Sequence, residues 1–195
     1  KEYFCEVLLG VGSDTHDVLG ITESDIPLHP SPTDIMRILE GFRGTITLPY
    51  PHFSSKTVKG KRLHMWTLEK RLHEIEIPTK TSRIYTLNLI GMRTQSGREI
   101  VHDVREKISL LPQVTDPRKA LGEDFRRVEV LSSWDTFLSH HEHDRYTILS
   151  LRCIASSGTY MRTLGAQIGE KLGTKALAYS IHRSRIGTFL PLPFL

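Results

Sequence analysis

Residues 154–164 are the most informative segment of the chain and read Ile154-Ala155-Ser156-Ser157-Gly158-Thr159-Tyr160-Met161-Arg162-Thr163-Leu164. An apolar run ends here in a turn of small residues, and the pattern that follows predicts an amphipathic helix. Arg162 falls in the first turn of that helix, where the positive end of the helix dipole disfavours a cation. The arginine therefore needs an anionic partner, either a carboxylate or a phosphate.

A second segment, far upstream, offers two carboxylates and reads Gly10-Val11-Gly12-Ser13-Asp14-Thr15-His16-Asp17-Val18-Leu19-Gly20. The residues before it, 3–9, are mostly apolar and predict a buried strand that ends at Gly10. The polar residues from Asp14 to Gly20 predict a loop. Asp14 and Asp17 are thus the candidate protein partners of Arg162.

Between the two segments the pattern alternates between helix and strand. Ser31, Pro32 and Asp34 form a helix start, with serine at the N-cap and an acid in the first turn. The remaining predictions are a helix up to residue 42, a strand at 45–48, a short helix at 63–72, a strand at 82–90 and a strand at 146–155.

Residues 97–143 differ in character and predict two amphipathic helices. Apolar side chains recur at spacings of three and four between residues 100 and 111 and again between 125 and 138. His140, His141 and His143 close the segment. A metal site is one interpretation of these histidines, but we favour an exposed polar turn and assign no metal. Residues 114–122 are the most linker-like stretch.

The composition is that of an ordinary globular protein, with 195 residues, 38% hydrophobic and 25% charged. A net charge of +4 suits a polyanion such as nucleic acid, and it is equally common in other soluble proteins. No apolar run reaches the length of a membrane span, so we expect no membrane partner. Cys5 and Cys153 each lie in an apolar run, which predicts buried free thiols in a cytoplasmic protein.

Two further segments complete a set of four. The third contains Pro51-His52-Phe53-Ser54-Ser55 and Gly60-Lys61-Arg62-Leu63, and the fourth contains Ile181-His182-Arg183-Ser184 with Gly187 and Phe189. Together with Lys1-Glu2-Tyr3 ahead of the Asp14–Gly20 loop, and Ile168-Gly169-Glu170-Lys171-Leu172-Gly173 after Arg162, they occur in the order found in one family. The chain resembles the TruB family of tRNA pseudouridine synthases.

The resemblance implies an α+β fold with a mixed, largely antiparallel sheet and flanking helices. Compact members of the family have a short hairpin where this chain has residues 97–143, so we expect an inserted helical subdomain there. We predict a first part of the catalytic domain at residues 1–96, an inserted helical segment at 97–143 and a second part at 144–195. One departure stands out, because the family's catalytic aspartate lies in a Gly-Gly-Thr-Leu-Asp-Pro-like segment that no residue range of this chain matches. We therefore expect a fragment that follows the nucleophile segment.

The resemblance also implies roles for individual residues. Tyr3 matches the tyrosine that packs on the uracil and is the candidate base for the C5 proton. Arg162 matches the arginine that pairs with the catalytic aspartate, and Asp17 is its best partner within this chain. Tyr160 is expected to form a wall of the pocket, and Ile181 to cover the uracil as an apolar lid. On pattern alone, Tyr3 is a strand aromatic and Ile181 a core residue.

Cations around Gly60 are the candidate phosphate-binding residues. They are Lys56, Lys59, Lys61 and Arg62, and Arg183 of the fourth segment is added as a further substrate-binding residue. A solvated loop would explain the lysines equally well. The family carries lysine three residues before this glycine, where the present chain has Thr57, so the phosphate contact has shifted or vanished.

The implied activity is the isomerisation of uridine to pseudouridine in the T-loop of tRNA (position 55 in tRNA numbering). No redox step occurs in this reaction, so no cofactor is expected, and we expect a monomer. One alternative is a non-catalytic RNA-binding or RNA-chaperone module built on the same scaffold. Another is an isomerase whose different specificity is set by the inserted helices.

Overall fold

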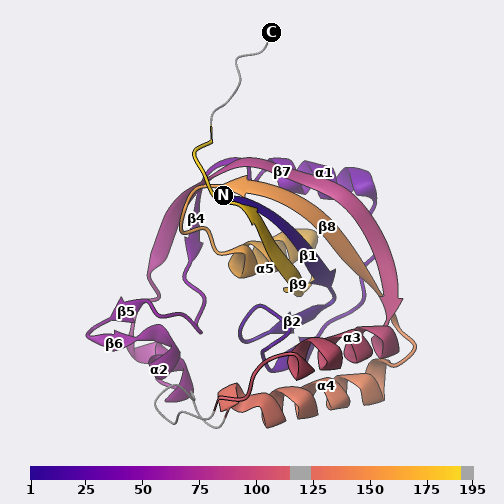
Figure 1. Cartoon of the computed structure of the whole chain (residues 1–195). Coiled ribbons are helices and arrows are strands. Elements are labelled where there is room, and N and C mark those ends of the chain that lie inside the picture. Colours follow the sequence, from indigo (N-terminus) through magenta and orange to yellow (C-terminus); the bar gives the residue numbers. More distant parts are fainter. Residues whose placement is uncertain (115–123, 190–195) are drawn as a thin grey trace.

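A curved five-stranded sheet forms the centre of the computed structural model, which describes residues 1–114 and 124–189 (Figure 1). The strand order is β4-β7-β8-β1-β9. The strands are β1 (Glu2–Leu9), β4 (Gly44–Pro49), β7 (Thr79–Ser96), β8 (Arg145–Ala155) and β9 (Ala176–Arg185). All four strand pairings are antiparallel, and within the described ranges the one parallel contact is an isolated bridge between Asp17 and Ala178. The prediction of a largely antiparallel sheet with flanking helices is confirmed.

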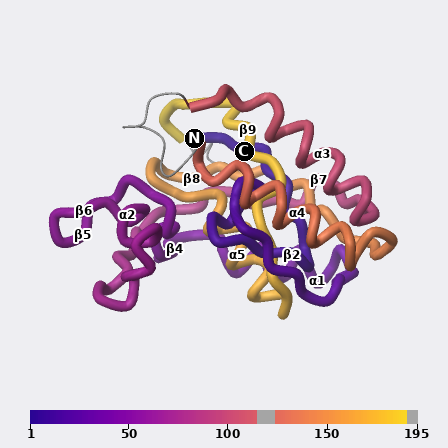
Figure 2. Tube along the Cα trace, turned by 90° about the horizontal axis from the view of Figure 1, so that it is seen from below, coloured from indigo at the N-terminus to yellow at the C-terminus, as the bar shows by residue number. Residues whose placement is uncertain are grey.

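Helices cover both faces of the sheet (Figures 1 and 2). One face packs against α1 (Pro32–Glu40) and α5 (Met161–Leu172). The other face packs against α3 (Gly97–Ser109) and α4 (Arg127–His141). The remaining elements are short: β2 (Val11–Ser13), β3 (Thr22–Ser24), β5 (Thr57–Val58), β6 (Lys61–Arg62), α2 (Leu63–Leu68), and the single turns η1 (Leu72–Glu74) and η2 (Asp124–Arg126).

The alternation of side chains along β1 explains why the sheet has two cores. Tyr3, Cys5 and Val7 face the core shared with α1 and α5, whereas Leu8 faces the core shared with α3 and α4. Cys5 and Cys153 are buried free thiols, as predicted. Burial raises the pKa of each thiol to about 12, which keeps both protonated and unreactive at neutral pH.

Several predicted elements are confirmed and others differ. The helix start at Ser31 is as expected, since its hydroxyl accepts a hydrogen bond from the Asp34 amide. The helix predicted at 63–72 ends earlier, at Leu68, because the chain turns through a left-handed residue at Lys70 (φ 56°). β7 is twice as long as predicted, with 18 residues. No strand was predicted where β9 lies.

The two helices predicted in residues 97–143 are present as α3 and α4. A capping box between Ser96 and Glu99 starts α3. Both helices bury their apolar stripes against strands of the central sheet, with Trp134 fully enclosed. Most of the linker-like stretch 114–122 lies outside the described residues. Among the helices that are described, none is long and apolar enough to cross a membrane.

Candidate functional site

The loop from Ser13 to Gly20 holds the Asp17 carboxylate in a fixed orientation. The Thr15 hydroxyl donates to Asp17 Oδ1 at 2.6 Å, and the Leu19 amide donates to the same oxygen at 3.0 Å. The Ser13 hydroxyl donates to the Asp17 carbonyl at 2.6 Å. One carboxylate oxygen is therefore occupied by the loop itself, and Oδ2 remains for another donor.

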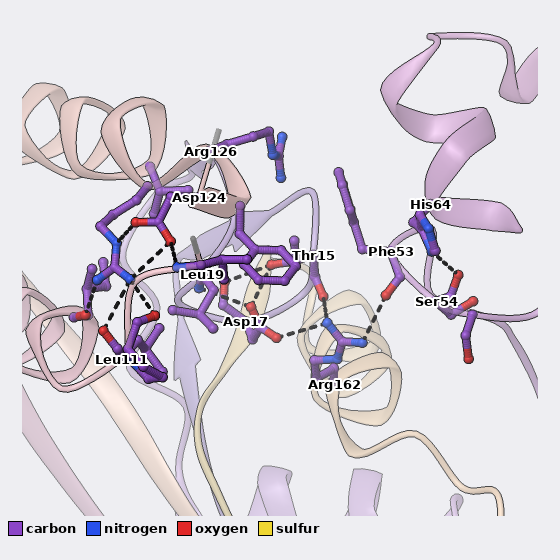
Figure 3. Close-up of a pocket in the computed structure, with 17 residues that line it drawn as sticks. Thr15, Asp17, Leu19, Phe53, Ser54, His64, Leu111, Asp124, Arg126 and Arg162 are labelled. Atoms are coloured by element: carbon purple, nitrogen blue, oxygen red, sulfur yellow. Dashed lines mark hydrogen bonds and ion pairs between the residues drawn. The ribbon is translucent and has the colours of Figure 1, made fainter. Parts of the chain in front are cut away.

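Arg162 is that donor (Figure 3). Its Nη1 donates to Asp17 Oδ2 at 3.0 Å and to the Thr15 carbonyl at 3.2 Å, while Nη2 donates to the Phe53 carbonyl at 3.3 Å. Arg162 lies in the first turn of α5, where the helix dipole disfavours a cation, and Asp17 supplies the compensating charge. The guanidinium thus joins three segments that are far apart in the sequence.

Tyr3 and Ile181 lie on the sheet face that α5 covers. Tyr3 is buried among residues that include Met161, the neighbour of Arg162. Antiparallel pairing places Tyr3 opposite Arg183 and Cys5 opposite Ile181, so all four side chains point to the same face. Ile181 is 42% exposed, so it is available to a ligand rather than enclosed in the core.

Tyr160 and Lys56 meet around a third residue, Tyr50. The ring of Tyr160 lies edge-on to the ring of Tyr50, with centroids 5.4 Å apart. The ammonium group of Lys56 lies over the Tyr50 ring, 5.4 Å from its centroid. The structure therefore brings one of the predicted phosphate-binding lysines next to the predicted pocket wall.

Lys59 and Lys61 are engaged within their own part of the chain. Lys59 donates to the Glu74 carbonyl at 3.1 Å. Lys61 forms an ion pair with Glu69 at 2.7 Å and lies over the Trp66 ring, 4.7 Å from its centroid. An RNA phosphate would have to compete with these partners.

A pocket of about 470 Å³ borders the Arg162–Asp17 pair. Its volume is in the range of small-molecule sites. Its walls come from the loop at residues 15–19, the segment 53–64, residues 108–114 and 124–130, and Arg162 of α5. The lining residues include Thr15, Asp17, Phe53, Ser54, His64, Leu111, Phe125, Arg126 and Arg162. Asp17 and Arg162 belong to this lining, whereas Tyr3, Tyr160 and Ile181 do not.

Residues 1–107 match the family described as TruB family pseudouridylate synthase (N terminal domain). The chain belongs to the TruB family. Its relatives include the tRNA pseudouridine synthase B of Deinococcus radiodurans, which is 28% identical over 97% of this chain and 54% of its own length. The protein of the same name from Syntrophomonas wolfei is 28% identical over 97% of this chain and 46% of its own length.

The chain thus spans about half the length of these TruB-family relatives. Among solved structures, a chain of a Cbf5-Nop10-Gar1 complex superimposes with a TM-score of 0.44 and 14% identity, covering 95% of this chain and 30% of that chain.

Three residues of this TruB-family chain lie at the site without having been predicted there. Phe53 was part of a quoted segment but was given no role. His16 stands between the two aspartates and has a left-handed backbone (φ 61°). Arg126 lies in the segment 97–143, where the apolar periodicity carries no signal for a polar contact.

His16 is a titratable group beside the ion pair. Within the described part of the chain its Nδ1 is buried and has no hydrogen-bond partner. Burial lowers the pKa of His16, and the nearby His52 and Arg162 lower it further, against the opposing effect of Asp17 and Asp14. The imidazole is therefore neutral at neutral pH, which avoids a second cation next to Arg162.

Proposed function

We propose that this chain is part of a tRNA pseudouridine synthase that isomerises uridine to pseudouridine in the T-loop of tRNA, at position 55 in tRNA numbering. The observation that supports the proposal is the Arg162–Asp17 ion pair, which joins two motif segments 145 residues apart. A guanidinium with a carboxylate on one side and a pocket on the other can hold a second carboxylate, because its planar fork has five donors.

The reaction breaks the bond between the sugar and N1 of uracil, turns the base and joins it through C5. It requires a nucleophile or base at the sugar, removal of the C5 proton, and a pocket that holds the base out of the helix. Arg162 would orient the nucleophilic aspartate of the family. Tyr3 would accept the C5 proton and Ile181 would cover the uracil, because both face the same side of the sheet next to α5.

The strand pairings support the proposed division of the chain. β1, from the first part (residues 1–96), pairs on one side with β8 and on the other with β9, both from the second part (residues 144–195). We infer that these two parts form one catalytic domain and that residues 97–143 are inserted into it. Free buried cysteines fit a reducing compartment, so we place the protein in the cytoplasm. We further propose that it acts as a monomer.

We infer that RNA is held by a few cations on the site side of the molecule. The candidates are Lys56, which lies over the Tyr50 ring beside Tyr160, and Arg183, which pairs opposite Tyr3. Binding through a small number of phosphates weakens steeply as the salt concentration rises.

The test is tritium release from tRNA that carries C5-labelled uridine. The complete gene product should release tritium from a T-arm RNA, and it should release none when the uridine at position 55 is replaced by cytidine. Residues 1–195 alone should bind the same RNA in a salt-dependent manner and release no tritium, since they contain no segment like that of the family's nucleophile. RNA binding without release by the complete gene product would favour the non-catalytic RNA-binding module.

A further inference from the structure

Two arginines, not one, connect the loop at residues 13–20 to Phe53. Both arginines and Phe53 are labelled in Figure 3. Arg162 pairs with Asp17 and donates to the Phe53 carbonyl at 3.3 Å. Arg126 pairs with Asp14, with Nη1 2.7 Å from Oδ2 and Nη2 3.3 Å from Oδ1. The Arg126 guanidinium also lies over the Phe53 ring, 4.3 Å from its centroid.

We propose that Arg126 is a further positioning residue of the site: it fixes the Phe53 ring against the loop that carries Asp14 and Asp17, so that the ring forms a stacking wall for an RNA base. The inference rests on the proposed function for its ligand. An aromatic face is a sequence-tolerant platform for a nucleobase. Both Phe53 and Arg126 line the 470 Å³ pocket beside Arg162.

The backbone that carries Arg126 is strained. Asp124, Phe125 and Arg126 form a turn in which all three φ angles are positive, at 46°, 55° and 61°. Non-glycine residues in this region are strained and persist where the surroundings hold them in place. Arg127 and the amide of Val114 both bind the Asp124 carboxylate and hold the turn, at 2.6 and 3.0 Å.

Arg126 also occupies a position that helix formation does not explain. It is the N-cap of α4 and makes no capping hydrogen bond with its side chain. Serine, threonine and aspartate are favoured there, and a cation is disfavoured by the helix dipole. Arg162 meets the same unfavourable dipole two positions further on, in the first turn of α5, whose N-cap is Tyr160. In both cases an aspartate of the same loop compensates the charge, and in both cases the arginine reaches Phe53.

Partial burial strengthens the contacts that Arg126 makes with Asp14 and Phe53. Arg126 and Asp14 are 19% and 32% exposed, so the ion pair is only partly screened by water. Arginine stacks on aromatic faces through its planar guanidinium, and lysine cannot replace this geometry. Arg126→Lys therefore separates the two contacts, because it keeps a cation for Asp14 and removes the planar group from Phe53.

Hydrogen exchange of the chain tests the positioning role without any catalysis. In Arg126→Gln, the backbone amides of residues 13–20 and 52–56 should exchange about three- to tenfold faster than in the parent, while the amides of α1 should stay protected. Arg126→Lys should restore protection at 13–20 but not at 52–56. The matched control is Arg105→Gln, which removes an ion pair between α3 and α4 (Arg105–Asp135, 2.6 Å) away from the pocket. It should accelerate neither segment.

RNA binding separates this inference from the proposed function. Arg126→Gln should weaken binding of a T-arm hairpin about three- to tenfold, and Arg126→Lys should weaken it as well if Phe53 stacking is what is lost. Unchanged exchange at 52–56 in Arg126→Gln, or equal acceleration in Arg105→Gln, would overturn the positioning role. Faster exchange in a protein that binds no RNA at all would support the positioning role and overturn the function.

Discussion

Trp134 of α4 donates its indole N–H to the carbonyl of Val18, 3.0 Å away and 116 residues earlier in the chain. Val18 follows Asp17 directly, so a fully buried side chain of the segment 97–143 holds the loop on which the ion pair depends. Ser133, the preceding residue, accepts a hydrogen bond from the Thr22 amide at 2.7 Å just after the same loop. The helices at 97–143 therefore belong to the architecture of the site.

Trp134→Phe should destabilise the chain and loosen the loop. Phenylalanine keeps most of the apolar volume but leaves the Val18 carbonyl without a partner, at a cost of about 1–3 kcal/mol. Urea unfolding and hydrogen exchange at residues 13–20 measure the two effects. Trp66→Phe is the control, because Trp66 of α2 donates to the Val58 carbonyl of β5 at 3.1 Å, eight residues earlier in the chain. If both variants loosen the loop equally, Trp134 has no specific role there.

On the proposed function, Arg162→Lys should fold nearly normally and impair turnover of the complete enzyme by about 100-fold. Lysine lacks the planar fork that joins Asp17 to the Phe53 carbonyl and that would also hold the nucleophilic aspartate of the family. Arg162→Ala should cost less than the about 3–5 kcal/mol of breaking a dry ion pair, since Arg162 and Asp17 keep 24% and 18% exposure and can hydrate. Single-turnover rates measure the loss of turnover, and urea midpoints measure the loss of stability. Parent-like turnover by Arg162→Lys would make the arginine structural.

His16→Asn should change how stability depends on pH. The lowered pKa of His16 means that the unfolded state binds a proton more readily than the folded state. His16 therefore contributes a penalty that grows as pH falls below about 6.5, the ordinary pKa of histidine. Asparagine tolerates the left-handed backbone and does not titrate. The free energy of unfolding of the variant should thus fall less than that of the parent between about pH 8 and pH 5. Parallel curves would show that His16 does not titrate in this way.

Gly169→Ala should destabilise the packing of α5 on β9. An added Cβ would lie 2.3 Å from the Ala176 Cβ and 2.9 Å from the Thr174 carbonyl, so the helix has to move away from the strand. Overpacking of this kind costs about 1–3 kcal/mol, more than the gain in helix propensity from alanine. Gly91→Ala is the control, because its nearest neighbour would be the Ser150 Cβ at 3.7 Å. Equal urea midpoints for parent and Gly169→Ala would contradict the close approach.

The sequence predicts the Arg162–Asp17 pair because the position of each residue in the sequence independently indicates a partner of opposite charge. Arginine at the start of a helix requires an anion, and the polar loop at residues 14–20 offers two. Asp17 turns out to pair with Arg162, and Asp14 with Arg126. The second pairing could not be predicted, since it depends on a left-handed turn that places Arg126 across the pocket.

β9 escaped prediction for a related reason. Its first half is a run of small and apolar residues, Ala176 to Tyr179, which is too short to distinguish a strand from a loop. Its second half is polar because it lies at the edge of the sheet and is exposed. The helices at 97–143 were predicted from their apolar stripes, but the face of the sheet that they cover is a property of tertiary packing.

The position of β1 between β8 and β9 has a consequence for synthesis on the ribosome. β1 is translated before both of its neighbours in the sheet, which are formed by residues 145–155 and 176–185. Both edges of β1 stay without their partners until the late strands have left the exit tunnel, and unpaired apolar strands are prone to wrong association. The site loop, which follows β1 and binds β9 through His16 and Ala178, is therefore completed only after translation of β9.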